Sequence, residues 1–252
     1  WGKEKSLNNL NINIMAKPMR NGSYMIVEKY RESKMMARSV WWDKDTNTEK
    51  GTLLVKDIMD GKVFDYPKPM EMLMRLCEMG TSSEDADIVM DFFSGSGTTA
   101  HAVMNLNAKD SGNRKFIMVQ LPEACDENTE AYKAGFKNIS EIGKERIRRA
   151  GEQIKKEIEN KNRQSKLNEE PSVVPDIGFR VFKIDDTNMK DVYYSVAEYS
   201  QETIEGLVDN VKEDRTDLDL LYQVLINWGL PLDLKHEMEE IDGYTIHTVD
   251  TD

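Results

Sequence analysis

Hydrophobic and polar positions in the middle of the chain follow the order strand, glycine-rich loop, helix and second strand. The apolar run 88–90 ends at Asp91, a helical pattern begins near Thr98, and the apolar run 115–121 follows it. This order is typical of two parallel strands joined by a right-handed helical crossover. The pattern therefore predicts an α/β fold for this part of the chain.

Helical patterns flank the two strands. Residues 53–59 fit a short helix. Pro67 and Pro69, one residue apart, impose an extended backbone, and Pro69 then suits the first turn of a helix that ends near Met79. Between Ile139 and Ile158 apolar residues recur every three to five positions, which predicts an amphipathic helix of about 20 residues.

The chain changes character after this helix. Residues 161–175 are polar, contain two prolines and indicate a linker. Beyond them, residues 179–184 alternate as a strand does, residues 217–228 fit a helix, and the segment IDGYTIHTV at 241–249 fits a hairpin. We therefore expect four parts: a first region at 1–60, the main α/β part at 61–160, the linker at 161–175, and a small α+β module at 176–252.

Charge is distributed unevenly along the chain. The sequence holds 34 basic and 46 acidic side chains, a net charge of −12, which argues against a grip on nucleic acid through bulk positive charge. Residues 137–166 carry ten basic and five acidic side chains, whereas residues 185–252 carry four basic and eighteen acidic ones. The basic run at 144–149 indicates either contacts to DNA phosphates or a solvated helix face. The acidic C-terminal module favours protein contacts.

Composition excludes several classes of protein. No apolar run approaches the ~20 residues that a membrane helix needs, and the first ten residues lack an apolar signal core. Two cysteines are too few for a disulfide framework or a cysteine-based zinc site. His236 and His247 have no acid or cysteine at ligand spacing. We expect a cytoplasmic protein without a metal ion and without membrane contact.

The glycine-rich loop between the two strands carries the candidate chemistry. Gly95 and Gly97 allow the backbone to turn sharply, and the amides at the start of the next helix suit a carboxylate or a phosphate. Asp91 lies at the carboxyl end of a parallel strand, where open α/β sheets bind ligands, and its charge suits a cationic group. His101, in the first turn of that helix, is expected to be partly exposed, with an approach to the ligand as the alternative.

Three ligands compete for this loop, and a plain turn without a ligand is the fourth interpretation. A nucleoside triphosphate would need a lysine after the second glycine, and none is present. A dinucleotide would need G-x-G-x-x-G close to the strand end, which residues 95–100 fit loosely as G-x-G-x-x-A. S-adenosylmethionine (SAM) combines a cationic amine with a carboxylate, which an acid followed by a glycine loop and a helix N-terminus matches.

The loop sequence DFFSGSGTT at 91–99 resembles the SAM-binding motif D-x-F-x-G-S-G-T-T of amino-methylating DNA methyltransferases. The segment FDYPKP at 64–69 resembles the second SAM-contacting motif of that family, which precedes the glycine loop in the β order of motifs. More closely, the chain from Gly51 to about residue 151 resembles the C-terminal half of the modification (Mod) subunits of type III restriction–modification systems. Residues 178–185 and 220–232 also resemble that group.

The resemblance implies a fold, a cofactor and a set of contacts. It implies a partial Rossmann-like SAM-methyltransferase sheet with flanking helices, followed by the acidic α+β module. Asp91, Gly95 and Gly97 would hold the methionine portion of SAM. The strand residue that takes the ribose hydroxyls matches Gln120, and Glu123 follows three positions later, so either could serve. The remaining implied cofactor contacts are Lys68, Pro69, Phe92, Phe93, Ser94 and Thr98.

The catalytic motif of the family, [DNS]-P-P-[YFW], is not present in this sequence. The chain has seven prolines and no two are adjacent. The motif's polar group and aromatic ring handle the flipped base. We therefore expect a C-terminal fragment of an adenine-specific DNA methyltransferase that begins near the end of the target-recognition region, contains no catalytic residue and is inactive alone. The alternatives are an NAD-binding Rossmann fragment and a non-catalytic interaction module.

The resemblance also implies partners. The whole subunit would bind DNA, associate with itself as a homodimer, and bind a restriction (Res) subunit. The acidic module at 176–252 is the expected contact region for self-association or for the Res subunit.

Overall fold

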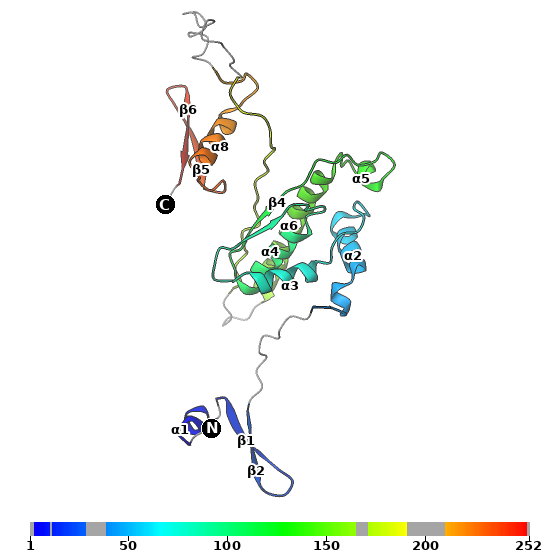
Figure 1. The fold of residues 1–252 in the computed structure, drawn as a ribbon, viewed down its shortest axis with the longest axis vertical. Helices are drawn as coiled ribbons and strands as arrows, with labels where there is room; N and C mark the ends of the chain where they lie inside the picture. The colour runs from blue at the N-terminus through cyan, green and yellow to red at the C-terminus, as the bar shows by residue number, and fades with distance from the viewer. Residues whose placement is uncertain (1–2, 11, 29–38, 165–170, 191–209, 251–252) are drawn as a thin grey trace, which may run out of the picture. The chain divides into compact units, whose positions relative to one another are not determined.

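The computed structural model of the chain describes residues 3–10, 12–28, 39–164, 171–190 and 210–250. It divides into two compact units, Trp1–Ile177 and Gly178–Asp252, which are described separately here (Figure 1). The helices and strands of the first unit are α1 (Lys3–Asn9), β1 (Ile14–Pro18), β2 (Tyr24–Glu28), the 3₁₀ helix η1 (Lys44–Thr46), α2 (Thr48–Met59), α3 (Met70–Gly80), β3 (Ile88–Asp91), α4 (Thr98–Asp110), β4 (Lys115–Met118), α5 (Glu130–Lys133) and α6 (Ile139–Gln164).

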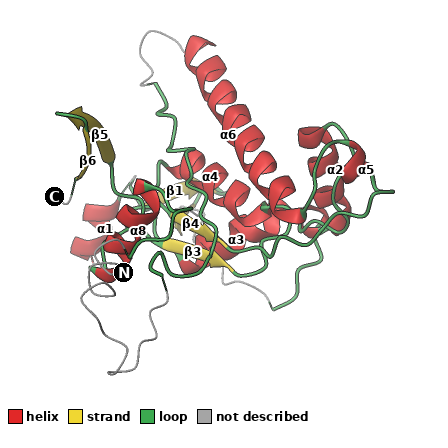
Figure 2. Ribbon diagram, turned by 90° about the horizontal axis from the view of Figure 1, so that it is seen from above, coloured by secondary structure: helices red, strands yellow, loops and turns green. Residues whose placement is uncertain are grey.

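A parallel strand pair forms the centre of the first unit. β3 and β4 pair in parallel from Ile88 opposite Lys115 to Asp91 opposite Met118, and α4 connects them. Figure 2 shows the two strands side by side. The predicted parallel pair and its helical crossover are therefore confirmed, although β4 ends at Met118 rather than near residue 121.

The two faces of this pair differ in burial. On one face, α3 and α4 pack against the strands, with buried Cys77, Val103 and Leu106 in contact with Val89 and Phe116. On the other face Ile88, Met90 and Ile117 are 60%, 48% and 45% exposed in the part of the chain that the structure describes. The mixed α/β class is as predicted, and the described sheet consists of two strands.

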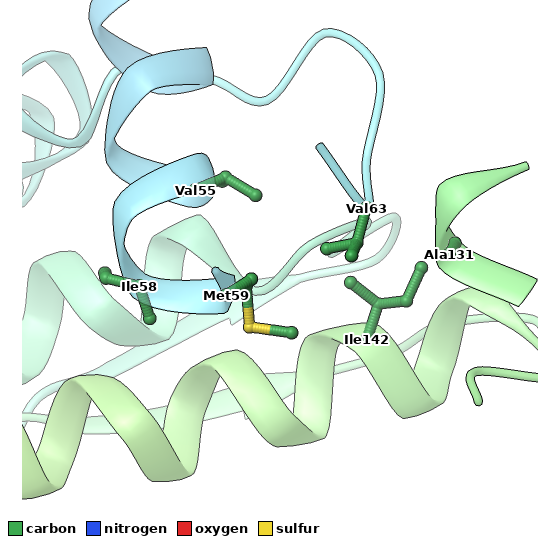
Figure 3. Packing of buried hydrophobic residues seen from close by; sticks show 6 residues of the cluster. All are labelled: Val55, Ile58, Met59, Val63, Ala131 and Ile142. Atoms are coloured by element: carbon green, nitrogen blue, oxygen red, sulfur yellow. The ribbon is translucent and has the colours of Figure 1, made fainter. Parts of the chain in front are cut away.

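A second apolar cluster joins α2, α5 and α6. Val55, Ile58 and Met59 of α2 pack with Val63, Ala131 and Ile142. Figure 3 shows the α2 side chains gathered above α6, from which Ile142 points toward them. This cluster fixes α6 against the segment that precedes α3. The helix α6 continues to Gln164, into the range expected for a linker.

The segment 64–69 lies directly against α2. A Cβ atom on Gly51 of α2 would be 2.4 Å from the carbonyl oxygen of Pro67 and 2.8 Å from that of Lys68. Pro67 and Pro69 are fully buried, and Pro69 is the N-cap residue of α3, as its ring and extended backbone predict. The absence of a side chain at Gly51 therefore sets the position of the proline segment.

The described elements that remain are α1, η1, two hairpins and α8. In the first unit, β1 and β2 pair antiparallel around Asn21-Gly22. In the second unit, α8 (Asp217–Asn227) begins with a capping box formed by Thr216 and Asp219, and β5 (His236–Ile241) pairs with β6 (Tyr244–Val249). The predicted helix at 217–228 and the predicted C-terminal hairpin are confirmed.

Contrary to the prediction, the described residues 179–184 are not assigned to a strand. The guanidinium group of Arg180 donates hydrogen bonds to the carbonyl oxygens of Leu232 and Leu234, and the ring of Phe182 meets Tyr222 edge to face. These side-chain contacts connect the segment to α8 and to the residues before β5.

The contact at Gly51 gives a stability prediction. Gly51→Ala should lower the free energy of unfolding by about 1–3 kcal/mol, because the new methyl group would meet backbone oxygens that cannot move without displacing Pro67. Gly80→Ala, in α3, is the matched control: its Cβ would enter open space, so helix propensity should stabilise the protein by up to about 1 kcal/mol. Urea titrations of both variants measure the difference, and equal effects would contradict the proposed contact.

Candidate functional site at the glycine loop

The loop that follows β3 crosses the end of β4. The N–H of Ser94 donates to the carbonyl oxygen of Val119 at 3.1 Å, and the N–H of Val119 donates to that of Asp91 at 2.9 Å. The loop then turns through Gly97, which caps α4 with φ of 75°, a left-handed conformation that glycine adopts without strain. The first amides of α4 therefore lie at the carboxyl edge of the strand pair, next to the glycine loop.

The carboxylate of Asp91 joins the loop to the helix. Its Oδ2 accepts a hydrogen bond from the hydroxyl of Thr99 at 2.6 Å, and its Oδ1 accepts one from the N–H of Phe93 at 3.2 Å. Asp91 is half-buried rather than enclosed in an apolar interior. Because a carboxylate offers about four lone-pair positions, these two bonds leave acceptor capacity for a ligand.

The two candidates for the ribose contact lie in different environments. The side-chain oxygen of Gln120 accepts a hydrogen bond from the N–H of Gly95 at 2.7 Å, so Gln120 is tied to the glycine loop. Glu123 is exposed beyond the end of β4, and its backbone carbonyl accepts from the N–H of Ile139 at the start of α6. Both residues thus lie in the segment that leaves β4, and only Gln120 contacts the loop directly.

The segment 64–69 meets the glycine loop in space. A Cβ atom on Gly95 would be 3.0 Å from Cζ of Phe64, so the ring of Phe64 lies against the loop backbone. Lys68 is exposed, whereas Pro69 is buried. Tyr66 adopts a left-handed φ of 57°, rare for an aromatic residue, and is 89% exposed. Such backbone strain is typical of binding sites. Phe64, which sequence reasoning did not assign to the site, is the residue that joins the two segments.

The predicted cofactor contacts at 92–98 fall into two groups. Phe92 and Phe93 are exposed, by 63% and 81%, at the point where the chain leaves β3. Ser94 is half-buried, and Thr98 is buried at the start of α4. The aromatic pair therefore forms an open apolar surface, and the hydroxyl groups lie on the inner side of the loop.

The helix α6 supports the loop from beneath. A Cβ atom on Gly143 would be 3.0 Å from the carbonyl oxygen of Gly95, and one on Gly97 would be 3.1 Å from that of Gly143. One turn further, Arg146 is fully buried, and its Nη1 donates to the hydroxyls of Ser96 at 2.7 Å and Thr98 at 2.6 Å. The backbones of the loop and the helix are in direct contact.

Within the basic run at 144–149, Arg146 fits neither interpretation. It neither faces solvent nor is available to DNA phosphates, because it lies under the glycine loop. Arg148 is exposed, and Arg149 pairs with Glu145 at 2.8 Å and with Asp60 at 2.9 Å. The signal was present in the sequence: Ile142 and Ala150 lie four residues on either side of Arg146, so all three share the apolar face of the helix.

The expectation of a partly exposed His101 is also wrong. His101 is 4% exposed on α4, and its Nδ1 has no hydrogen-bond partner. Burial, and secondly the nearby charge of Arg146, lower the pKa of His101 to about 3, so its imidazole is neutral. The inner side of the loop therefore combines a buried cation with a neutral histidine.

The described residues show neither a metal-ion cluster nor a membrane-spanning helix. No group of three or more His, Cys, Asp or Glu side chains is arranged to hold a metal ion among those residues. Within the same residues, no helix combines the length and apolar character that a membrane span requires.

The fold is α/β, and a strand that ends in an acid, followed by a glycine loop and a helix N-terminus, is an arrangement at which open α/β sheets commonly bind ligands. The chain belongs to the DNA methylase family, whose model matches residues 3–156. It is 36% identical over 152 residues to the type III restriction–modification enzyme EcoPI Mod subunit of Escherichia phage P1. The matched residues cover 58% of this chain and 23% of that protein.

Two further relatives support the same assignment. The chain is 40% identical over 123 residues to the StyLTI Mod subunit of Salmonella typhimurium, covering 49% of this chain and 19% of that protein. It is 38% identical over 125 residues to the type II methyltransferase M.KpnI of Klebsiella pneumoniae, covering 49% of this chain and 29% of that protein. The match therefore spans less than a third of each relative. The predicted family is confirmed.

The buried histidine makes a testable contribution to acid sensitivity. Between pH 6.5 and about 3, the unfolded chain binds a proton at His101 that the folded chain does not, so stability present above pH 6.5 is lost as the pH falls. His101→Met removes this loss. When the pH falls from 6 to 5, the unfolding free energy of the variant minus that of the wild type should increase by about 1 kcal/mol. Urea titrations at both pH values measure the shift, and a constant difference would show that His101 is protonated in the folded protein.

Proposed function

We propose that residues 1–252 carry the SAM-binding part of an adenine-specific DNA methyltransferase of the type III Mod kind. The observation that supports this most directly is the contact between the segment 64–69 and the loop 91–99, through Phe64 and Gly95, at the carboxyl edge of a parallel strand pair. The two sequence segments that resemble SAM-contacting motifs thus meet at one place. The Mod subunits among the relatives belong to restriction–modification enzymes, which supports the choice of substrate.

The residues present fit the cofactor. The carboxylate of Asp91 retains acceptor capacity for the ammonium group of SAM, and the amides at the start of α4 suit its carboxylate. Gln120 or Glu123 would accept from the ribose hydroxyls. Lys68 and Pro69 would flank the pocket of the methionine portion, with Ser94 and Thr98 as neighbours, and Phe92 and Phe93 would complete the cofactor contacts. When bound, SAM supplies an electrophilic methyl group on its sulfonium.

Methyl transfer itself is proposed to need more polypeptide than these 252 residues. The sequence contains no adjacent prolines, and so no [DNS]-P-P-[YFW] motif to hold the target base. The exposure of Ile88, Met90 and Ile117 supports the same proposal, because parallel sheets are normally covered on both faces. The DNA-binding and base-handling surfaces would then lie on the polypeptide that completes this sheet.

Binding of S-adenosylhomocysteine, the product form of the cofactor, tests the assignment. We expect weak but measurable binding by calorimetry, and its loss in Gly97→Leu, whose side chain would meet Gly143 and Ile147. Gly135→Leu is the matched control, because Gly135 also has a positive φ, of 96°, but faces open space away from the loop. The unmodified chain, incubated with labelled SAM and DNA, should transfer no methyl group. Binding of NAD in place of S-adenosylhomocysteine would contradict the proposed function. Methyl transfer by the chain alone would contradict the proposal that further polypeptide is required.

The acidic second unit is proposed to be a protein-contact module, for a second copy of the chain or for a Res subunit, in a cytoplasmic enzyme. Residues 185–252 carry eighteen acidic and four basic side chains, which DNA would repel. Ile226 and Trp228, at the end of α8, are 62% and 75% exposed, and exposed aromatic residues of this kind anchor interfaces.

Trp228→Ser should weaken self-association by at least about tenfold, the effect of losing an aromatic anchor. Sedimentation of the full chain measures the dimer fraction over a range of concentrations. Trp42→Ser, which removes a 91% exposed tryptophan from the first unit, should leave association unchanged. An unaltered dimer in the Trp228 variant would place the interface elsewhere.

A further inference from the structure

The first unit contains a buried positive charge that the fold does not neutralise. Arg146 is 0% exposed, and Nη1 makes all of its hydrogen bonds, to the hydroxyls of Ser96 and Thr98 and, at 3.5 Å, to the carbonyl oxygen of Ser96. In the part of the chain that the structure describes, its Nε and Nη2 have no hydrogen-bond partner. Burial lowers the pKa of the guanidinium group only to about 10, so Arg146 is a cation at neutral pH.

Arg114, another buried arginine of this unit, is neutralised by a carboxylate. Arg114 makes two hydrogen bonds to the carboxylate of Asp110, at 3.0 and 2.9 Å, and a third from Nε to the hydroxyl of Thr81. Among the residues that the structure describes, no carboxylate makes such a contact with Arg146. A buried charge without a counter-ion costs several kcal/mol and is normally found only where a partner arrives or a ligand is bound.

Neighbouring groups do not offset this charge. His101 is buried beside Arg146 and neutral, and its Nδ1 also lacks a partner. The N-terminus of α4 adds a partial positive charge on the same side of the loop. The carboxylate of Asp91 is turned to Thr99 and Phe93 instead. Two unpartnered buried side chains and a helix N-terminus therefore converge behind residues 96–98.

We propose that Arg146 is a positioning residue for the carboxylate of the ligand that the glycine loop binds. It acts through the loop: its charge orients the hydroxyls of Ser96 and Thr98 and attracts an anion to the amides that follow. The proposal rests on the proposed function, in which that anion is the methionine carboxylate of SAM. Because the charge is buried, solvent ions screen it only weakly.

The test compares two ligands that differ only by this carboxylate. S-adenosylhomocysteine carries it, and its decarboxylated analogue, S-adenosyl-3-thiopropylamine, keeps the adenosine, the thioether and the amine. Wild type should prefer S-adenosylhomocysteine, and Arg146→Met should lose about tenfold in affinity for it while binding the analogue as wild type does. Arg146→Lys should retain only part of the preference, because a buried lysine loses its charge more readily than an arginine does. Arg148→Met, the same substitution at an exposed position two residues away, should bind both ligands as wild type does.

The outcomes separate this inference from the function on which it rests. Equal weakening of both ligands in Arg146→Met would show a merely structural role and overturn the inference. Failure of the wild-type chain to bind either ligand would instead overturn the proposed function. Should Arg146→Met not fold, the wild type still decides: its preference for the carboxylate should change little between about 0.05 and 0.5 M salt, because a buried charge escapes screening. A preference that disappears with salt would assign the effect to surface charges.

Discussion

The candidate site depends on the direct contact between the backbone of the glycine loop and that of α6. Gly143 and Gly97 face each other so closely that a Cβ atom on either would lie about as near to a carbonyl oxygen as real structures permit, at 3.0 and 3.1 Å. Without side chains in between, the loop rests on the helix, and the turn at Gly97 is supported from below. The hydrogen bonds from Gly95 to Gln120 and from Thr99 to Asp91 then hold its other side. Backbone contacts on one side and hydrogen bonds on the other therefore hold the loop in position.

This support also explains why α6 is amphipathic yet carries a cation on its apolar face. Ile142 and Ile147 pack against α2 and the loop, and Arg146 occupies the same face between them. An apolar side chain there would fill the space but leave the hydroxyls of Ser96 and Thr98 without a charged donor. The three described hydrogen bonds of Arg146 all come from Nη1, so the rest of its guanidinium group contributes charge rather than hydrogen bonds. Packing alone does not account for that choice of residue.

Elements with strong local signals could be predicted from the sequence, and contacts between distant segments could not. Pro69 marked the start of α3, the segment 241–249 indicated the C-terminal hairpin that the structure places at 236–249, and the apolar period marked α6. Residues 179–184 have the alternation of a strand but are not assigned to one, because alternation alone carries no information about pairing. Arg146 was not predicted to be buried, because its basic neighbours Lys144, Arg148 and Arg149 suggested a solvated helix face. Its spacing of four residues from Ile142 nevertheless placed it on the apolar face of the helix.

The described contacts of the candidate site all come from residues between Thr48 and Gln164. Phe64 arrives after α2, Asp91 and the loop after β3, Gln120 after β4, and Arg146 from α6, while the buried clusters that hold these elements involve the same stretch. The glycine loop and the supports beneath it thus belong to one continuous stretch of the first unit, and the acidic second unit is a separate stretch of the sequence.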